Sequence, residues 1–218
     1  MKRFHINAFL RATRGVAAIE FAMLVPVTFV MIAGTFETGR YIQKARQVQQ
    51  TAVNVGRILS QTAGPFSDND LTLARNTVYL SIPDIATKTK GDTRPVSDRV
   101  RVNLMAVDIT MAPFCAPGTS CSIARPNWVS SDSERNCDQL SLSATALDYD
   151  PGKLPVGMRL NAGSVLVVDV IYNYQPIVGA SFIPGDAFRM VRSAYFDPRL
   201  VSTFTLSNAS GNVAQACN

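Results

Sequence analysis

Residues 16–36 read VAAIEFAMLVPVTFVMIAGTF, and this stretch decides the architecture of the chain. It contains one charged side chain, Glu20. As an α-helix it would be about 31 Å long, which matches the roughly 30 Å hydrocarbon core of a bilayer. A cleaved signal peptide has a shorter apolar region and ends in a small-x-small site, whereas the small-residue break here is Ala33-Gly34. We therefore expect a retained transmembrane helix.

The positive charge of the chain is concentrated around this segment. The formal net charge is +5 over 218 residues, of which 47% are hydrophobic and 17% are charged. Residues 1–15 carry only basic charges, residues 37–62 are mainly basic, and residues 63–218 are nearly neutral. This composition excludes a disordered chain and a polytopic membrane protein. A nucleic-acid-binding domain would carry a basic face of its own, so we expect no nucleic-acid partner.

The body of the sequence lacks the residues that common catalytic sites need. Its single histidine, His5, lies beside the N-terminus, which excludes a Ser-His-Asp or Cys-His set and a His-ligated zinc site. The acidic pairs Asp68/Asp70 and Asp148/Asp150 lie in turn contexts. Carboxylates there cap helices more often than they hydrolyse glycosides. We expect no enzymatic activity, no cofactor and no metal.

All four cysteines follow the apolar segment. They are Cys115, Cys121, Cys137 and Cys217. An even set without C-x-x-C spacing favours two disulfides in an oxidising compartment over a zinc or redox site. Basic residues flank the apolar segment on both sides, so the cysteines, rather than charge, place the C-terminal domain outside the cytoplasm. Three connectivities are possible. Our hypothesis pairs Cys115 with Cys121, around a short loop with Pro117-Gly118, and Cys137 with Cys217.

The helix is expected to continue beyond residue 36 and to end near Gly64-Pro65, because no proline occurs between Val27 and Gly64. Small or apolar residues recur with a 4-3-4-3-4 spacing that is typical of one helix face. They are Tyr41, Ala45, Val48, Ala52, Val55 and Leu59. This stripe either docks on the C-terminal domain, which we favour, or forms a seam for self-assembly.

The pattern after Pro65 predicts an α+β domain. We expect a capped helix over 69–80 and strands over 99–112, 164–174 and 187–196. The alternation of the first strand slips at Leu104-Met105, which predicts a β-bulge there. Tyr172 and Tyr174 fall on one strand face, where packing explains them.

Residues 113–163 hold three cysteines and the only tryptophan, Trp128, and we expect them to be irregular and stapled by a disulfide. The predicted fold class is therefore α+β: a long N-terminal transmembrane helix continues into an exported antiparallel β-sheet domain with a disulfide-stapled insertion. The predicted divisions are 1–15, a basic leader; 16–36, a transmembrane helix; 37–63, a periplasmic helix extension; and 64–218, a periplasmic domain.

The segment RGVAAIEFA, residues 14–22, resembles a type IV prepilin processing site. In that family a basic leader ends in Gly, cleavage follows the Gly, and Glu is the fifth mature residue. The resemblance implies cleavage between Gly15 and Val16 by a prepilin peptidase, with Glu20 in the fifth mature position. It also implies that Glu20 and Phe21 make assembly contacts, and that Glu20 meets the new amino group.

The longer stretch GVAAIEFAMLVPVTFVMIAGTFETGRYIQKARQVQQTAVNVGR resembles the TadE-like family of minor pseudopilins in Tad/Flp (type IVc) pilus systems. The resemblance covers about residues 10–62. The residues that carry it are Gly15, Ala18, Glu20, Phe21, Pro26, Glu37, Gly39-Arg40 and Gly56-Arg57, followed much later by Tyr172, Tyr174 and Pro176. Many major Tad pilins carry Glu-Tyr at the processing site. This chain has Glu20-Phe21, which points to the minor group.

The resemblance implies a structural, non-catalytic role in assembling a Tad/Flp-type adhesive pilus. The implied partners are a prepilin peptidase, other pilins and pseudopilins, the inner-membrane pilus assembly platform and the lipid bilayer. The implied location is the bacterial inner membrane, crossed once, with a cytoplasmic N-terminus and a periplasmic domain. Whether the protein enters the filament, caps it or stays at its base is left open.

The carboxylate of Glu20 is energetically unfavourable inside a membrane helix. At the helix centre it costs about 2.5–3.5 kcal/mol on insertion scales, and less near the edge. Cleavage after Gly15 would place an amine four residues before Glu20, where a helical pair forms, and a helix N-terminus also favours negative charge. The plain alternative is a tolerated interfacial Glu20. Two rival functions remain: a periplasmic binding or sensor domain with an uncleaved Gly15–Val16 bond, or an exported hydrolase that uses carboxylates such as Asp148.

Overall fold

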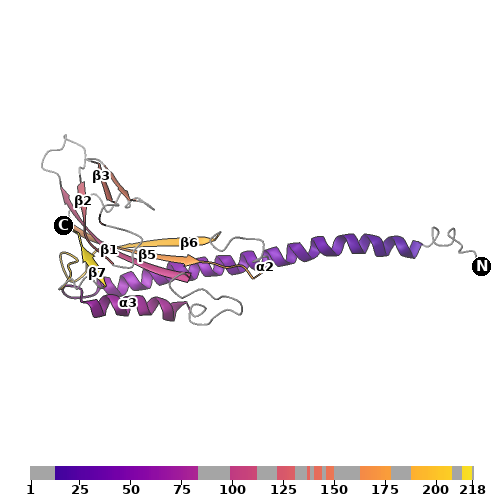
Figure 1. Ribbon diagram of the computed structural model, residues 1–218, viewed down its shortest axis with the longest axis horizontal. Helices are drawn as coiled ribbons and strands as arrows, with labels where there is room; N and C mark the ends of the chain where they lie inside the picture. Colours follow the sequence, from indigo (N-terminus) through magenta and orange to yellow (C-terminus); the bar gives the residue numbers. More distant parts are fainter. Residues whose placement is uncertain are drawn as a thin grey trace, which may run out of the picture.

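A long helix and a five-stranded antiparallel sheet make up most of the described chain (Figure 1). The computed structural model describes residues 13–82, 99–111, 122–130, 137, 140–143, 146–149, 163–177, 188–207 and 213–217. The elements are α2 (Thr13–Ser60), α3 (Asp68–Ser81), β1 (Val100–Met111), β2 (Ser122–Ser130), β3 (Leu140–Ser143), β4 (Ala146–Tyr149), β5 (Gly163–Asn173), β6 (Arg189–Phe196) and β7 (Ala214–Ala216).

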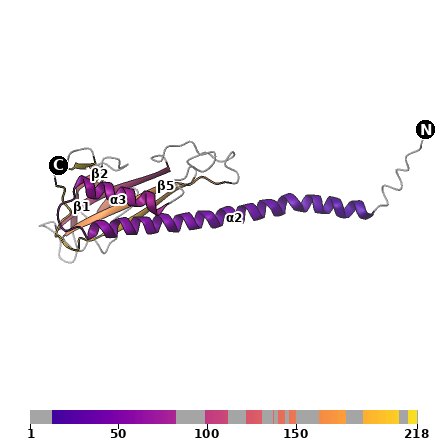
Figure 2. The same ribbon diagram turned by 90° about the horizontal axis from the view of Figure 1, so that it is seen from below.

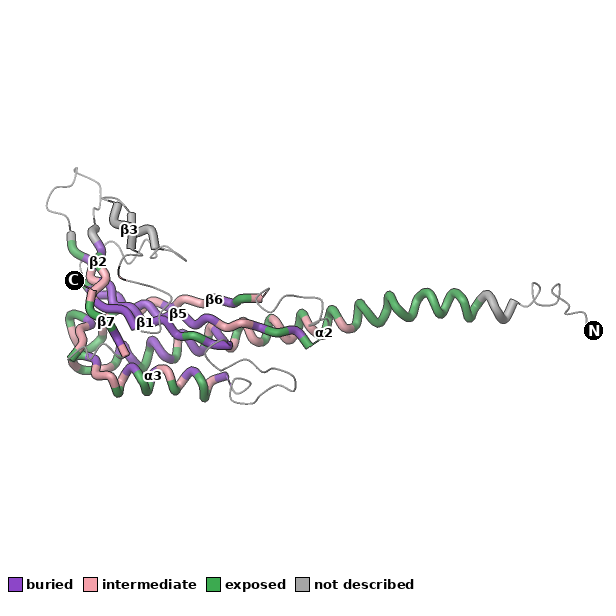
Figure 3. The backbone as a smooth tube through the Cα atoms, viewed as in Figure 1, coloured by how far each residue is buried: buried purple, intermediate pink, exposed green. Residues whose placement is uncertain are grey.

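Helix α2 is continuous over 48 residues, with Pro26 inside it. Its N-terminal half projects away from the rest of the molecule, and its C-terminal half lies along the sheet (Figures 1 and 2). Figure 3 shows the same division as a change from exposed to buried residues along the helix. The helix ends at Ser60, a few residues before the predicted stop. The turn that follows passes through Gly64, whose φ of 133° suits glycine.

The sheet has the order β6-β5-β1-β2-β7, and every neighbouring pair is antiparallel. Helices α2 and α3 share one core cluster with one face of this sheet. From α2 that cluster takes four residues of the predicted stripe, all essentially without exposed surface: Val48, Ala52, Val55 and Leu59. The stripe therefore docks on the domain, as expected. Strands β3 and β4 form a separate two-stranded sheet.

Helix α3 begins with a capping box. The hydroxyl of Ser67 accepts a hydrogen bond from the backbone N–H of Asp70, and the Asp70 carboxylate accepts one from the backbone N–H of Ser67. The predicted helix is correct, and the N-cap is Ser67 rather than one of the aspartates. The Ser67 hydroxyl thus satisfies one free N–H of the first turn, and the Asp70 carboxylate satisfies the N–H of the N-cap residue.

Strand β1 is buried on both faces, and the predicted bulge at Leu104-Met105 is wrong. Leu104 and Ala106 join the core shared with the helices, whereas Met105 and Val107 join a second cluster on the other face. The pairing of β1 with β5 runs without a register shift from Val100 to Ile109. Because both faces of β1 are covered, consecutive residues of the strand are apolar. In the sequence this looks like a shift in the alternation of apolar and polar residues.

The irregularity lies instead in β2, a strand that the sequence pattern did not predict. In the pairing of β1 with β2, Ala106 lies opposite Trp128, but the next residue, Val107, lies opposite Pro126. Asn127 is therefore the extra residue of a β-bulge. The bulge lets Ala124 and Val129, five positions apart, face the same cluster. It also tolerates Pro126, which has no N–H for the ladder. The bulge and the proline both disturb the alternation of apolar and polar residues by which a strand is recognised in a sequence. For this reason we expected an irregular region where the structure has a strand of the main sheet.

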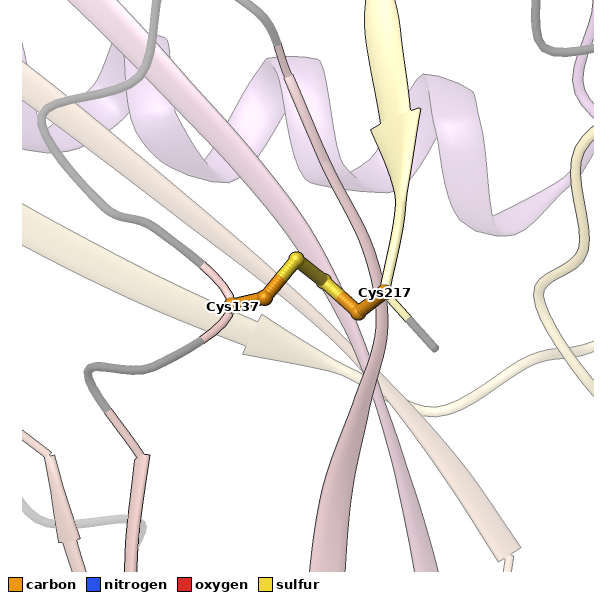
Figure 4. The surroundings of a disulfide bond; sticks show 2 residues. All are labelled: Cys137 and Cys217. Carbon is orange, nitrogen blue, oxygen red and sulfur yellow. A yellow bond between two sulfur atoms is a disulfide. The ribbon is translucent and has the colours of Figure 1, made fainter.

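A disulfide joins Cys137 to Cys217, which are 80 positions apart and have a Cα–Cα distance of 5.4 Å (Figure 4). This is one of the two pairings in our hypothesis. Both cysteines pack against the cluster on the sheet face opposite the helices. The other expected pair, Cys115 and Cys121, lies outside the described residues.

At Gly56 the backbone of α2 packs directly against a side chain of the sheet. A Cβ added there would overlap the ring of Phe196 in β6. We therefore expect Gly56→Ala to lower the free energy of unfolding by about 1–3 kcal/mol, the usual cost of overpacking. The measurement is urea denaturation of the full-length protein in detergent, followed by the fluorescence of Trp128, which is fully buried.

Gly39→Ala is the matched control, because a Cβ at Gly39 meets nothing within 4 Å. That variant should leave the unfolding midpoint of the domain unchanged. Equal midpoints for the Gly56 and Gly39 variants would contradict the close approach of helix and ring.

Candidate functional site

The predicted processing and assembly residues all lie in the N-terminal part of α2. Gly15 and Val16 occupy its first turn, and Glu20 follows Val16 by four residues, which is about one turn. Glu20 and Phe21 are both exposed, and Phe21 keeps 70% of its surface. No described part of the domain covers this end of the helix (Figure 3).

The uncovered half of α2 is apolar. Every residue from 17 to 32 is exposed, and the large apolar side chains among them are Ile19, Phe21, Met23, Leu24, Val25, Val27, Phe29, Val30, Met31 and Ile32. The helix is long and apolar enough to cross a membrane. An exposed apolar surface of this extent marks contact with a membrane or with other proteins.

A polar contact joins α2 to the domain where the uncovered half of the helix ends. The hydroxyl of Tyr174 donates a hydrogen bond to Oε1 of Glu37. The backbone N–H of Ile177 lies 3.3 Å from both carboxylate oxygens of Glu37. Tyr174 is itself held at the end of β5, where its N–H donates to the Phe188 carbonyl oxygen at 3.1 Å. We call this contact the Glu37–Tyr174 latch.

The Tyr174 ring of the latch packs against two other aromatic rings. Tyr41 packs edge-on against Tyr174 and Phe188, with ring centroids 5.6 and 6.1 Å apart, and the Tyr174 and Phe188 centroids are 6.3 Å apart. This edge-to-face geometry is the favoured one for aromatic pairs. Burial raises the pKa of Tyr174 well above its usual value of 10.0, and the hydrogen bond to Glu37 raises it further. The phenol is therefore held in its neutral, proton-donating form.

Arg40 lies one turn beyond Glu37 on the same helix. Its guanidinium carbon is 6.0 Å from the centroid of the Phe36 ring, a cation–π distance. Nη1 of Arg40 is buried and has no hydrogen-bond partner among the described residues.

A groove of about 660 Å³ runs along α2 beneath the latch. We call it the exit groove. Its lining includes Phe29, Ala33, Gly34 and Glu37 from the helix, and Tyr174 and Pro176 from the domain. Among the described residues, no group of three or more His, Cys, Asp or Glu side chains could hold a metal ion.

One comparison with known proteins bears on this helix. Residues 15–57 match the TadE-like protein family. We call residues 15–57 the TadE-like segment. The match confirms the resemblance to TadE-like proteins over this segment. No curated protein and no solved structure matches the chain significantly.

The TadE-like segment is almost the whole of α2. It begins at Gly15, two residues after the start of the helix, and ends at Arg57, three residues before its end. Two residues that carried the resemblance gain a physical role from the structure: Glu37 accepts the latch hydrogen bonds, and Gly56 admits the Phe196 ring.

The latch was missed by reasoning from sequence, which assigned Tyr174 to packing alone. The available signal was a single acidic residue, Glu37, directly after an apolar helix, together with a distant Tyr-x-Tyr-x-Pro segment. Their pairing depends on the hairpin of β5 and β6 returning to the helix, 137 positions later in the chain. Sequence spacing carries no information on such a contact.

The raised pKa of Tyr174 generates a prediction for stability against pH. The folded state favours the neutral phenol of Tyr174. The contribution of this phenol to the free energy of unfolding is therefore complete below the usual pKa of 10.0, and it is lost as the pH rises toward the raised pKa. We expect Tyr174→Phe to lower the free energy of unfolding by about 1–3 kcal/mol at neutral pH. The difference from the unmodified protein should shrink between about pH 9 and about pH 11.

Urea denaturation at a series of pH values measures this difference. Tyr79→Phe is the control, because Tyr79 is an exposed residue of α3. It should follow the unmodified protein at every pH. A constant difference between Tyr174→Phe and the unmodified protein up to about pH 11 would contradict a neutral, buried phenol.

Proposed function

We propose that this chain is a minor pseudopilin: a structural, non-catalytic subunit that takes part in assembling a Tad/Flp-type adhesive pilus. The observation that carries the proposal is the match of residues 15–57 to the TadE-like family. It begins at the glycine after which cleavage is expected, and it includes the apolar half of α2 that the domain leaves uncovered. A helix of this kind needs a membrane or neighbouring helices around it.

The proposed location is the bacterial inner membrane. The uncovered half of α2 crosses the bilayer once, the basic N-terminus is cytoplasmic, and the domain is periplasmic. The length and composition of α2 support a spanning helix. The Cys137–Cys217 disulfide supports an oxidising compartment for the domain. The latch then lies at the level where α2 leaves the membrane.

The first turn of α2 suits proteolytic processing. Peptidases cleave extended backbone, and Gly15 and Val16 lie within a helix. The first turn is easily opened, because its N–H groups have no partner within the helix and helix ends fray. A prepilin peptidase in the membrane is therefore the proposed first partner, and it would release the leader, residues 1–15.

After cleavage, Glu20 becomes the functional charge of the segment. Its carboxylate lies one turn from the new amino group of Val16. In a bilayer both charges are costly unless they are paired. We propose that Glu20 pairs with such an amine, its own or that of a neighbouring subunit, and that Phe21 packs beside it. Other pilins and pseudopilins, and the inner-membrane assembly platform, are the proposed assembly partners.

Processing is tested with variants of Gly15. Co-expression with a cognate prepilin peptidase should give a mature chain that starts at Val16, as measured by intact mass. Gly15→Val should block cleavage, because a β-branched side chain fills the space that glycine leaves open to the peptidase. Gly34→Val serves as the control, because Gly34 has open space around it and lies far from the bond. An unprocessed native chain would instead favour a single-pass periplasmic sensor.

The role of Glu20 is tested by complementation of a strain that lacks this protein. Glu20→Gln keeps the size of the side chain and removes the charge. Loss of an ion pair of about 1.4 kcal/mol weakens a subunit contact about tenfold, so pili should become scarce. Protein level, membrane insertion and cleavage should stay normal, and Glu20→Asp, which keeps the charge, should retain more piliation. Normal piliation with Glu20→Gln would contradict an assembly role for the charge.

A further inference from the structure

A second groove, of about 550 Å³, lies between α2 and β6. We call it the flank groove. The helix lines one end of it with Tyr41 and Ile42 and the other end with Arg46, Gln49 and Gln50, and the strand contributes Arg192. Strand β6 is the outermost strand of the described sheet. The flank groove therefore lies beside the docked half of α2, at the edge of the domain.

The flank groove brings two positive charges together. None of its described lining residues is acidic. Arg46 is exposed and makes no hydrogen bond or ion pair with the described residues. Arg192 donates one hydrogen bond, from Nη1 to the Val191 carbonyl oxygen at 3.1 Å. A guanidinium has five N–H donors, so most donors of both arginines are available to an anion that enters the groove.

We propose that the flank groove binds an extended acidic segment of a partner protein. Its carboxylates meet Arg46 and Arg192, and a neighbouring apolar side chain covers Tyr41 and Ile42. From Tyr41 to Gln50 the helix rises about 14 Å, a length that about four residues of extended chain span. This inference rests on the proposed function for the compartment in which the partner meets the domain.

The chemistry of the lining matches such a segment at each point. Arginine forms paired, charge-assisted hydrogen bonds with carboxylates. The side-chain amides of Gln49 and Gln50 both donate and accept hydrogen bonds, as the backbone of an extended chain requires. Ile42 keeps 46% of its surface exposed, so an apolar side chain laid on it removes apolar area from water.

Position and size favour a protein segment over a phospholipid or a free anion. Arg46 comes ten residues after Phe36, where the apolar segment ends, which is about 15 Å further along the helix. The headgroup layer on each side of a bilayer is only about 5–8 Å deep. Lipid phosphates therefore lie below the basic end of the groove. A free phosphate would reach the arginines but would leave Ile42 uncovered.

Zero-length crosslinking in the native membrane identifies the occupant. Arg46→Lys keeps the charge and places an amine in the groove, and a carbodiimide then joins that amine to a carboxylate in contact with it, with loss of water. We expect an amide link to an aspartate or glutamate of another protein, located by mass spectrometry of the crosslinked peptides. Arg199→Lys is the matched control, because Arg199 is exposed and does not line the groove.

The charge requirement is tested with a fluorescent eight-residue peptide that has one leucine followed by two glutamates in a glycine-serine background. Its binding to the full-length protein in detergent is measured by fluorescence anisotropy. Arg46→Gln and Arg192→Gln should each weaken binding about tenfold, because each removes a charged hydrogen bond. Arg199→Gln should leave binding unchanged, and added salt should weaken it. Equal binding of a peptide with glutamines in place of the glutamates would overturn the inference.

The crosslink has three outcomes that would also overturn it. A link from Arg46→Lys to a second copy of this chain would favour self-assembly, and no link above the Arg199→Lys control would leave the groove without a partner. A photo-crosslinking amino acid at Gln50 that captures phospholipid would favour a headgroup. Each result leaves the pseudopilin proposal intact if the chain is cleaved after Gly15. A native chain that keeps residues 1–15 would instead contradict the proposed function.

Discussion

The close packing of the C-terminal half of α2 on the sheet is the constraint on which the rest of the structure depends. At Gly56 the helix has no side chain, and the Phe196 ring of β6 takes that place. Val48, Ala52, Val55 and Leu59 then bury their full surface. Because α2 is one continuous helix, this docking also sets the direction in which its uncovered half leaves the domain.

The sheet itself is covered on both faces by apolar clusters of different size. The helix side carries an extended apolar core that includes Phe66, Trp128 and Phe204, with the Trp128 indole N–H donating to the Phe204 carbonyl at 3.0 Å. The other side carries a smaller cluster closed by the Cys137–Cys217 disulfide. The disulfide links Cys217, which follows β7, to Cys137 across 80 positions of the chain.

The latch connects this domain to the half of α2 that performs the proposed function. Glu37 and Tyr174 form a partly buried polar contact, and the Tyr174 ring packs against Tyr41 and Phe188. The latch ties the chain that follows β5 to α2 at the point where the uncovered half of the helix ends. The arrangement suits a subunit whose helix is held in an assembly and whose domain must keep one orientation relative to it.

The sequence by itself determined the long apolar helix, its amphipathic continuation, the helix after Pro65, three of the five strands of the main sheet and the resemblance to TadE-like proteins. These features depend on local periodicity and composition, which short windows contain. The tertiary structure alone decided the strand β2, the position of its bulge and the latch. Pro126 and Asn127 break the alternation of β2, and burial of both faces hides the phase of β1. The contact between Glu37 and Tyr174 joins residues 137 positions apart, and it exists only because the docked sheet carries the end of β5 back to the helix.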